Sequence, residues 1–157
     1  MRLNPIALII NIAIPLAFGV AGAFFTSSSV TTWYVTLAKP SFNPPNQIFA
    51  PVWTALYILI GISAYRVWQK RDTINRFPRT IAIYFIQLML NLMWSFIFFY
   101  SNQIGVAVFE IVFLLFIAIV NAILFYRIDK IAGLLFIPYI LWIIFATVLT
   151  YNIFILN

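Results

Sequence analysis

Five segments of the sequence are apolar over roughly twenty residues, which is the length that a helix needs to cross a membrane. They cover residues 6–25, 48–68, 80–100, 104–126 and 131–156. Hydrophobic residues make up 65% of the chain and charged residues 8%, whereas soluble domains contain about 45–50% and about 25%. Helices satisfy their backbone hydrogen bonds inside hydrocarbon. The sequence therefore predicts an all-α integral membrane protein, in which residues 1–157 form one domain, a five-transmembrane-helix bundle.

The first loop, predicted at residues 26–47, is long and contains a proline-rich stretch. Residues 33–45 read WYVTLAKPSFNPP. Proline fixes φ near about −65° and removes a backbone donor that a loop at a membrane surface would have to satisfy. We expect a structured lid over the helix ends, with Trp33, Lys39, Pro40 and Pro45 among its residues. Lys39 is expected to meet a lipid phosphate or solvent in preference to a ligand carboxylate.

Lysine and arginine are distributed unevenly between the two sides of the predicted bundle. Lys39 stands alone on the side of the lid, and all the other basic residues lie on the opposite side. Those residues are Arg2, Arg66, Lys70, Arg71, Arg76, Arg79, Arg127 and Lys130. Because cytoplasmic loops carry the excess of positive charge, we expect a cytoplasmic N-terminus and an outward C-terminus, as in a bacterial cell membrane. Positive charge confined to such loops does not indicate a nucleic-acid partner, although the net charge is +6.

Polar and aromatic residues recur within the predicted spans at helical spacing, where lipid contact alone would favour aliphatic residues. Each of three spans carries one such stripe. The stripes are Trp53, Tyr57, Gly61, Ala64 and Trp68; Gln87, Asn91, Trp94, Ser95 and Phe98; and Pro138, Tyr139, Trp142, Ala146 and Thr150. The fourth span adds Glu110, the one carboxyl group within a span. We interpret the stripes as the lining of a pocket beneath the lid.

Ordinary membrane architecture offers a second interpretation of the same residues. Tryptophan and tyrosine form belts at membrane interfaces, and amides bond between helices for about 0.6–2 kcal/mol. Glu110 is expected to form a hydrogen-bonded helix–helix contact, or to be a protonated acid, in preference to orienting a ligand. The small residues Ala13, Ala17 and Ala21 of the first span are predicted to form a close-packing face. Sequence leaves the pocket and packing interpretations open for Trp53, Asn91, Trp94 and Trp142.

The chain lacks the residues of most catalytic and metal sites. It contains no cysteine and no histidine, so disulfides, zinc sites and His- or Cys-ligated haem are excluded. Five glycines form no phosphate-binding loop, and no pair of carboxylates lies within the spans. Hydrolase and kinase chemistry are therefore not expected. An aromatic cleft with a few polar groups suits a flat, hydrophobic, partly polar small molecule.

Four stretches of the chain closely resemble the TspO/MBR family, which comprises bacterial tryptophan-rich sensory proteins and the mitochondrial translocator protein (the peripheral benzodiazepine receptor). They are WYVTLAKPSFNPP, PVWTALY at residues 51–57, QLMLNLMWSFIFF at 87–99 and PYILWIIFATVLTYN at 138–152. Two positions depart from the family pattern. Thr150 stands where an asparagine is common, and no basic residue follows Tyr151, so the animal sterol motif is incomplete and selective cholesterol binding is not predicted.

The resemblance implies a dimeric bundle that binds porphyrins such as protoporphyrin IX or haem as ligands, with no obligatory cofactor. Isoquinoline-carboxamide and benzodiazepine-type drugs, lipids and, in animal members, cholesterol are further implied ligands. The pocket residues it implies are Tyr34, Pro44, Trp53, Tyr57, Asn91, Trp94, Trp142 and Ala146, to which the stripes add Phe98 and Glu110.

Three functions remain open from the sequence. The leading one is a porphyrin-binding membrane sensor or regulatory protein of tetrapyrrole metabolism. The second is an enzyme that photo-oxidises bound porphyrin, for which the resemblance implicates Trp53 and Trp142. The third is a transporter of porphyrins or lipids. The sequence shows no internal repeat of the kind found in many transporters, which argues against the third.

Overall fold

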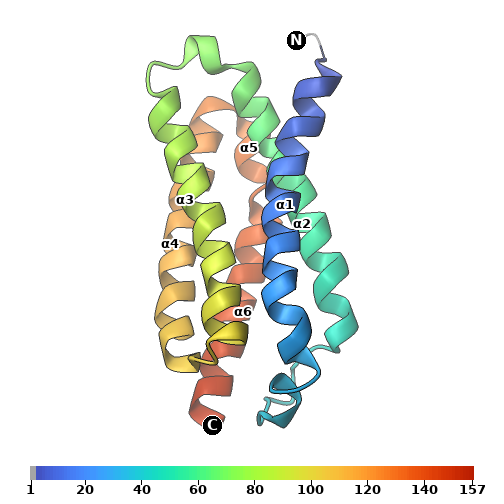
Figure 1. Cartoon of the computed structure of the whole chain (residues 1–157). Helices are drawn as coiled ribbons and strands as arrows, with labels where there is room; N and C mark the ends of the chain where they lie inside the picture. The colour runs from blue at the N-terminus through green and yellow to red at the C-terminus, as the bar shows by residue number, and fades with distance from the viewer. Residues whose placement is uncertain (1–2) are drawn as a thin grey trace.

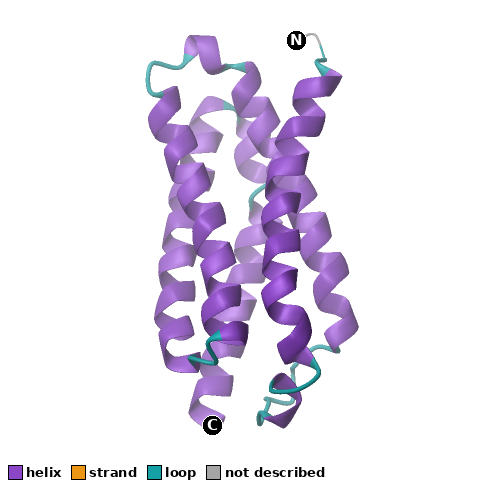
Figure 2. Ribbon diagram, in the orientation of Figure 1, coloured by secondary structure: helices purple, strands orange, loops and turns teal. Residues whose placement is uncertain are grey.

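The computed structural model describes residues 3–157, which form helices and turns and no strand (Figures 1 and 2). Five helical segments are long and apolar enough to cross a membrane. The α-helices are α1 (Pro5–Val30), α2 (Asn46–Gln69), α3 (Phe77–Ser95), α4 (Ile104–Ile128), α5 (Lys130–Leu134) and α6 (Ile137–Leu156). Short turns of other helical types are η1 (Tyr34–Thr36), η2 (Arg71–Thr73) and the π-helical η3 (Phe96–Tyr100). The predicted all-α membrane bundle is confirmed.

The helices form a closed ring in which α1 contacts α2 and α3, α3 contacts α4, and α4 contacts α6. The α5 and α6 helices complete the ring against α2. Figure 1 shows the connection from α2 to α3 and the turn from α4 to α5 at one end of the bundle, beside the N-terminus. The connection from α1 to α2 lies at the other end with the C-terminus. We call these the basic end and the lid end.

The first helix is longer and the lid shorter than predicted. We expected the helix to end at Phe25, before a polar stretch, but α1 continues to Val30. Hydroxyls at the start of this stretch bond within the helix: Thr26 Oγ1 donates to the Gly22 carbonyl at 2.9 Å and Ser27 Oγ to the Phe24 carbonyl at 3.3 Å. The lid accordingly covers residues 31–45 rather than 26–47.

Two further boundaries differ from the prediction at prolines, where one helix begins earlier than expected and another is interrupted. The third helix begins at Phe77 rather than at residue 80, because Pro78 occupies its first turn, where a missing N–H costs nothing. The fifth span is interrupted at Leu135 and Phe136, just before Pro138. Proline cannot donate the backbone hydrogen bond of a continuous helix, and this explains the separation of α5 from α6.

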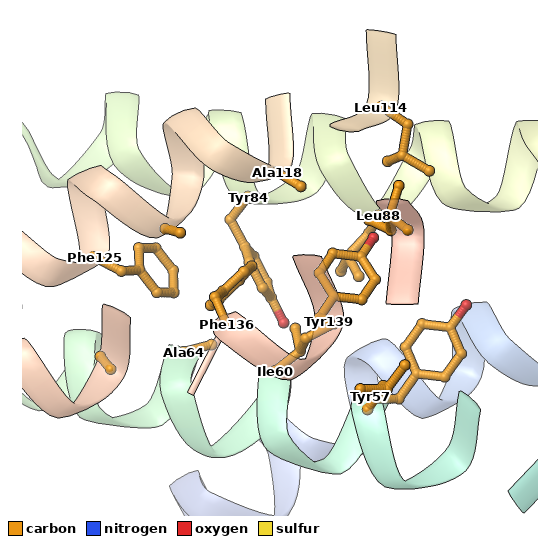
Figure 3. Packing of buried hydrophobic residues seen from close by; sticks show 14 of the residues in the cluster. Tyr57, Ile60, Ala64, Tyr84, Leu88, Leu114, Ala118, Phe125, Phe136 and Tyr139 are labelled. Carbon is orange, nitrogen blue, oxygen red and sulfur yellow. The ribbon is translucent and has the colours of Figure 1, made fainter. Parts of the chain in front are cut away.

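The core of the bundle lies where α2, α3, α4 and α6 meet. Figure 3 shows Tyr84 and Leu88 of α3 beside Phe136 and Tyr139, with Ile60 of α2 nearby. Tyr139, Phe136, Leu88 and Ile60 are completely buried. Side chains on the outer surface are largely aliphatic and aromatic, as expected for helices that face lipid.

The crossing of α1 and α2 depends on Gly61. A Cβ atom at this position would lie 2.5 Å from the Ile12 Cα atom and 2.8 Å from the Asn11 carbonyl oxygen. Both neighbours are backbone atoms, so a rotamer change cannot relieve the overlap. Small residues allow helices to approach this closely in membranes.

Gly61→Ala is therefore expected to push α1 away from α2 and to lower the free energy of unfolding by about 1–2 kcal/mol. Unfolding of the detergent-solubilised protein in increasing SDS measures the change. Gly105→Ala is the matched control, because a Cβ there would meet the ring of Phe154 at 3.1 Å, which is the end of a side chain. An equal loss of stability in both variants would contradict the proposed role of the α1–α2 crossing.

An ion-pair cluster joins helices at the basic end. Asp129 stands between α4 and α5, and its carboxylate accepts hydrogen bonds from Arg66 Nε at 2.8 Å and Arg66 Nη2 at 3.0 Å. Lys70 Nζ lies 2.9 Å from Oδ2, the oxygen that also accepts from Arg66 Nη2. The carboxylate also caps α5 by accepting from the Ala132 N–H at 2.9 Å. Asp129 thereby connects the end of α2 to the α4–α5 turn.

Candidate functional site

A cavity of about 450 Å³ lies between α1, α2, α3 and α6 at the lid end. This volume is within the range of small-molecule sites. Its wall is mostly apolar and includes eight residues of α1. The lining residues are Leu16, Gly19, Val20, Gly22, Ala23, Thr26, Ser27, Val30, Tyr34, Asn46, Phe49, Ala50, Trp53, Thr54, Tyr57, Asn91, Trp94, Ser95, Phe98, Phe99, Trp142, Ala146, Leu149, Thr150 and Ile153.

Three tryptophans supply much of the aromatic surface of the cavity. The rings of Trp53 and Trp142 meet edge to face, with centroids 6.3 Å apart. Trp94 stacks on Phe98 at 5.1 Å. The indole N–H groups of Trp94 and Trp142 are shielded from solvent and have no hydrogen-bond partner among residues 3–157. A buried donor without a partner is costly, so an acceptor atom of a ligand that reached either group would stabilise the site.

The deeper wall of the cavity is held by a polar network. Tyr57 donates through its hydroxyl to Asn91 Oδ1 at 2.7 Å, and Asn91 Nδ2 donates to the Tyr139 hydroxyl at 2.8 Å. Gln87 Nε2 donates to the same hydroxyl at 2.5 Å. Asn91 and Tyr57 therefore line the cavity with polar atoms that are already engaged. Their geometry indicates that they fix α2, α3 and α6 around the cavity and leave ligand hydrogen bonding to other groups.

Thr150, one of the two departures from the family pattern noted above, also faces the cavity. Its hydroxyl donates to the Ala146 carbonyl of its own helix at 2.8 Å. Threonine hydroxyls commonly bond in this way inside helices. The hydroxyl proton is thus used within α6, whereas an asparagine amide would offer the cavity a further donor.

The π-helical turn η3 shapes the lid end of the third span. The Ser101 N–H bonds to the Phe96 carbonyl at 2.9 Å, five residues back. Ser29 of α1 donates to the Phe99 carbonyl at 2.6 Å, which ties the two helix ends together. The wider turn places both Phe98 and Phe99 against the cavity. Such turns are frequent at functional sites.

The lid is anchored by Tyr34, whose ring is buried between the lid and the helix ends. Its hydroxyl donates to Asn43 Oδ1 at 2.8 Å. Burial raises the pKa of this hydroxyl above its usual value. Lys39 Nζ lies 4.7 Å from the Tyr34 ring centroid and donates to the Leu37 carbonyl at 3.0 Å. Lys39 is therefore engaged within the lid itself.

Asn157 fastens the lid to the end of α6. Its Oδ1 atom accepts from the Ala38 N–H at 3.0 Å, and its Nδ2 atom donates to the Ala38 carbonyl at 3.0 Å. The paired bonds hold the middle of the lid over the cavity. Sequence reasoning missed this contact because nothing in the local pattern links the two positions.

Asn157→Ala is expected to release the lid and to increase hydrogen exchange of the amides in residues 31–45 several-fold, since two hydrogen bonds of about 1 kcal/mol each are lost. Exchange measured by mass spectrometry in detergent tests this. Asn152→Ala is the control, because the Asn152 amide bonds only to the Val148 carbonyl of its own helix. Unchanged lid exchange in Asn157→Ala would show that Asn157 does not hold the lid.

Most of the predicted pocket residues line one cavity. Tyr34, Trp53, Tyr57, Asn91, Trp94, Phe98, Trp142 and Ala146 are all part of its wall. Pro44 is not, nor are the lid residues Trp33, Lys39, Pro40 and Pro45. Trp33 instead packs on Phe98 from behind, with ring centroids 5.5 Å apart.

Glu110 lies outside the cavity. It belongs to α4, which contributes no residue to the lining. Both carboxylate oxygens are shielded and have no hydrogen-bond partner within the described chain. The expected helix–helix hydrogen bond is therefore not formed in this structure.

Comparison with known proteins agrees with this arrangement. A model of the TspO/MBR family matches residues 11–156, which include the lid and every cavity-lining helix. The chain belongs to the TspO/MBR family. It is 41% identical to the tryptophan-rich protein TspO of Archaeoglobus fulgidus over 99% of both chains. It is also 32% identical to the human translocator protein, over 83% of this chain and 78% of the relative.

Other TspO/MBR relatives carry names of more than one kind. The Rhodobacter capsulatus protein CrtK is 33% identical over 88% of this chain and 85% of its own length. The tryptophan-rich sensory protein of Cereibacter sphaeroides is 33% identical over 80% of this chain and 77% of its own. The TspO/MBR family and the five apolar helices establish a multi-pass integral membrane protein.

Proposed function

We propose that this TspO/MBR protein binds a porphyrin, such as protoporphyrin IX or haem, in the cavity beneath the lid. The supporting observation is the pair of buried, unpartnered indole N–H groups of Trp94 and Trp142 in an otherwise aromatic wall. A porphyrin ring is flat and apolar and stacks on aromatic side chains. Its propionate carboxylates accept hydrogen bonds, which the two indole groups can donate.

The same chemistry accounts for other expected ligands. The carbonyl of an isoquinoline-carboxamide or benzodiazepine-type drug is an acceptor attached to a flat aromatic body, so it suits the same donors. Because the chain has no cysteine and no histidine, haem would gain no strong iron ligand from those residues. Protoporphyrin IX is therefore expected to bind about as tightly as haem.

The cavity is open toward the side of the bundle that faces lipid, and this supports the proposal of a ligand that partitions into the bilayer. Val20, Ala23 and Ser27 of α1 line the cavity and are exposed, as are Ala50 and Thr54 of α2. The cavity therefore reaches the surface between α1 and α2. We infer a sensor or regulatory role in tetrapyrrole metabolism, in which the lid and these two helices respond to occupancy.

Titration of protoporphyrin IX against tryptophan fluorescence in detergent tests the proposal. Saturable quenching with one porphyrin per chain is expected. An isoquinoline-carboxamide added afterwards should displace the porphyrin, because both ligands need the same wall. Non-saturable quenching that follows the porphyrin content of empty micelles would refute a specific site.

A second candidate is light-dependent oxidation of bound porphyrin by dioxygen. The observation that favours it is the contact of Trp53 with both Trp142 and Tyr139, at ring distances of 6.3 and 6.4 Å. Oxidisable side chains thus stand together at the cavity. Illumination should yield products that Trp53→Phe abolishes while binding persists. Equal breakdown with free tryptophan in solution would count against an enzyme.

We also propose that the basic end faces the cytoplasm of a bacterial cell membrane, which places the lid outside. Of the described basic residues, only Lys39 lies at the lid end; Arg2 lies outside the described residues. A reporter fused to the C-terminus and active only in the cytoplasm should give little signal. A strong signal would reverse the orientation.

A further inference from the structure

A second pocket, shallow and open, lies at the basic end, far from the cavity beneath the lid. It is formed where the connection between α2 and α3 passes the end of α4. Two isoleucines give it apolar walls, and three basic side chains surround them. The lining residues are Lys70, Thr73, Ile74, Asn75, Arg76, Arg127 and Ile128.

The positive charge of this pocket is only partly neutralised. The nearby carboxylate of Asp129 is engaged by Arg66 and Lys70. Asp72 pairs with Arg71 at 3.7 Å. Arg76 and Arg127 form no ion pair with any residue in 3–157, and both are exposed. A permanently charged guanidinium offers several donors in a plane, so these two are free to bind an anion.

Lys70 is a third potential donor to an anion in this pocket, although part of its ammonium group is already hydrogen-bonded. Its ammonium group donates to the Ile128 carbonyl at 3.0 Å and pairs with Asp129. An ammonium has three N–H donors, so one remains for a ligand. The two existing bonds hold Lys70 at the pocket wall, which reduces the entropy lost when an anion binds.

The start of α3 strengthens the attraction for an anion. Arg76 is the residue that precedes this helix, and no side chain caps its first turn. The helix dipole is positive there, which favours phosphate, but the Phe77 N–H already donates to the Ile74 carbonyl at 3.3 Å. Pro78 in the first turn has no N–H to contribute, so the guanidinium groups remain the main donors.

We propose that this pocket binds the phosphate headgroup of an anionic phospholipid. The pocket lies at the ends of α3 and α4, where the spans leave the hydrocarbon and headgroups are found. Ile74 and Ile128 offer an apolar surface to the upper part of the acyl chains. Basic pockets between transmembrane helices are known to recognise anionic headgroups. The site is separate from the cavity beneath the lid and does not depend on its ligand.

Native mass spectrometry of the full chain tests the proposal, with protein taken from nanodiscs that contain equal amounts of phosphatidylglycerol and phosphatidylcholine. The wild-type chain should retain phosphatidylglycerol in preference to phosphatidylcholine. Arg76→Gln with Arg127→Gln should lower retained phosphatidylglycerol by about 10- to 30-fold, because each variant side chain loses a direct hydrogen bond to the headgroup worth about 1 kcal/mol. Arg71→Gln with Arg79→Gln removes the same charge from residues that do not line the pocket, so retained phosphatidylglycerol should fall by less than about 3-fold, because exposed charges away from the bound headgroup are screened by salt.

Four outcomes would overturn the assignment. Equal losses in the two double variants would mean a diffuse attraction to the basic end rather than a site. No preference for phosphatidylglycerol in the wild type would exclude an anionic lipid. Complete displacement of phosphatidylglycerol by millimolar inorganic phosphate would identify a free phosphate site instead. Arg76→Lys with Arg127→Lys keeps the positive charge and should retain more phosphatidylglycerol than the Gln double variant, and an equal loss in the folded Lys variant would also contradict the proposal.

Discussion

Trp53→Ala combined with Trp142→Ala is expected to weaken protoporphyrin IX binding by about 100-fold, because each lost ring contact costs about 1.4 kcal/mol or more. Trp53 packs against Tyr57 at 5.7 Å and meets Trp142 edge to face. Together they form one side of the cavity, and Trp142 also supplies one of the two unpartnered indole donors. The double variant therefore loses both stacking surface and a hydrogen bond to the ligand. Quenching of Trp94, which remains, or porphyrin absorbance measures the affinity.

The matched control for this prediction is Trp68→Ala. Trp68 lies at the basic end, where it stacks on Tyr65 at 6.2 Å and carries the Arg71 guanidinium at 3.9 Å from its ring centroid. Trp68→Ala removes one indole ring, as each half of the double variant does, without touching the cavity, so the porphyrin affinity should stay within about 2-fold of wild type. Unchanged helicity by circular dichroism establishes that the double variant is folded. Unchanged affinity in the folded double variant would reject the cavity as the porphyrin site.

The helices and much of the cavity wall could be predicted from sequence, because the lipid environment makes deviations from an apolar pattern informative. Trp94 and Phe98 recur at helical spacing in a span where aliphatic residues would suffice, and the structure stacks them at the cavity. Trp142 lies too deep for an interfacial belt and indeed faces the same cavity. Sequence alone could not show which of these side chains are free to contact a ligand and which hold the helices together. Asn91 was expected as a ligand contact, yet its amide is engaged by Tyr57 and Tyr139.

The first helix was the least predictable part of the site. Its small residues were expected to pack at Ala13, Ala17 and Ala21, but Ala13 and Ala17 are exposed. The packing uses a different face, on which Gly19 and Gly22 lie against Tyr57 and Ser95. A helix with nearly uniform hydrophobicity carries little signal about which side is buried, because lipid and protein interior are equally apolar. The contribution of α1 to the cavity depends on tertiary contacts that no local pattern encodes.

Asp129→Asn is expected to lower the free energy of unfolding by about 3 kcal/mol, the lower end of the cost of breaking a buried ion pair. The Asp129 side chain is 5% exposed, while those of Arg66 and Lys70 are each 31% exposed. Asparagine keeps the size of the side chain and an oxygen that can cap α5 at the Ala132 N–H. The variant therefore removes the charge and leaves two cations near each other without compensation. SDS unfolding of the purified protein measures the loss, and Asp72→Asn, whose parent side chain is 83% exposed, should cost less than about 1 kcal/mol.

The same carboxylate gives the fold a defined sensitivity to acid. Burial by itself would raise the pKa of Asp129, but hydrogen bonds from Arg66, Lys70 and the Ala132 N–H outweigh it and lower the pKa below the usual value. The folded protein therefore binds this proton less readily than the unfolded chain, whose aspartate pKa is about 3.9. The stabilisation is complete above that pH and is lost as the pH falls below about 4 toward the folded pKa. The free energy of unfolding of the wild type should therefore fall over this range, whereas that of Asp129→Asn lacks this dependence. The difference in free energy of unfolding between the two proteins should become smaller. A difference that stays constant from pH 6 to pH 3 would show that the ionised carboxylate does not stabilise the basic end.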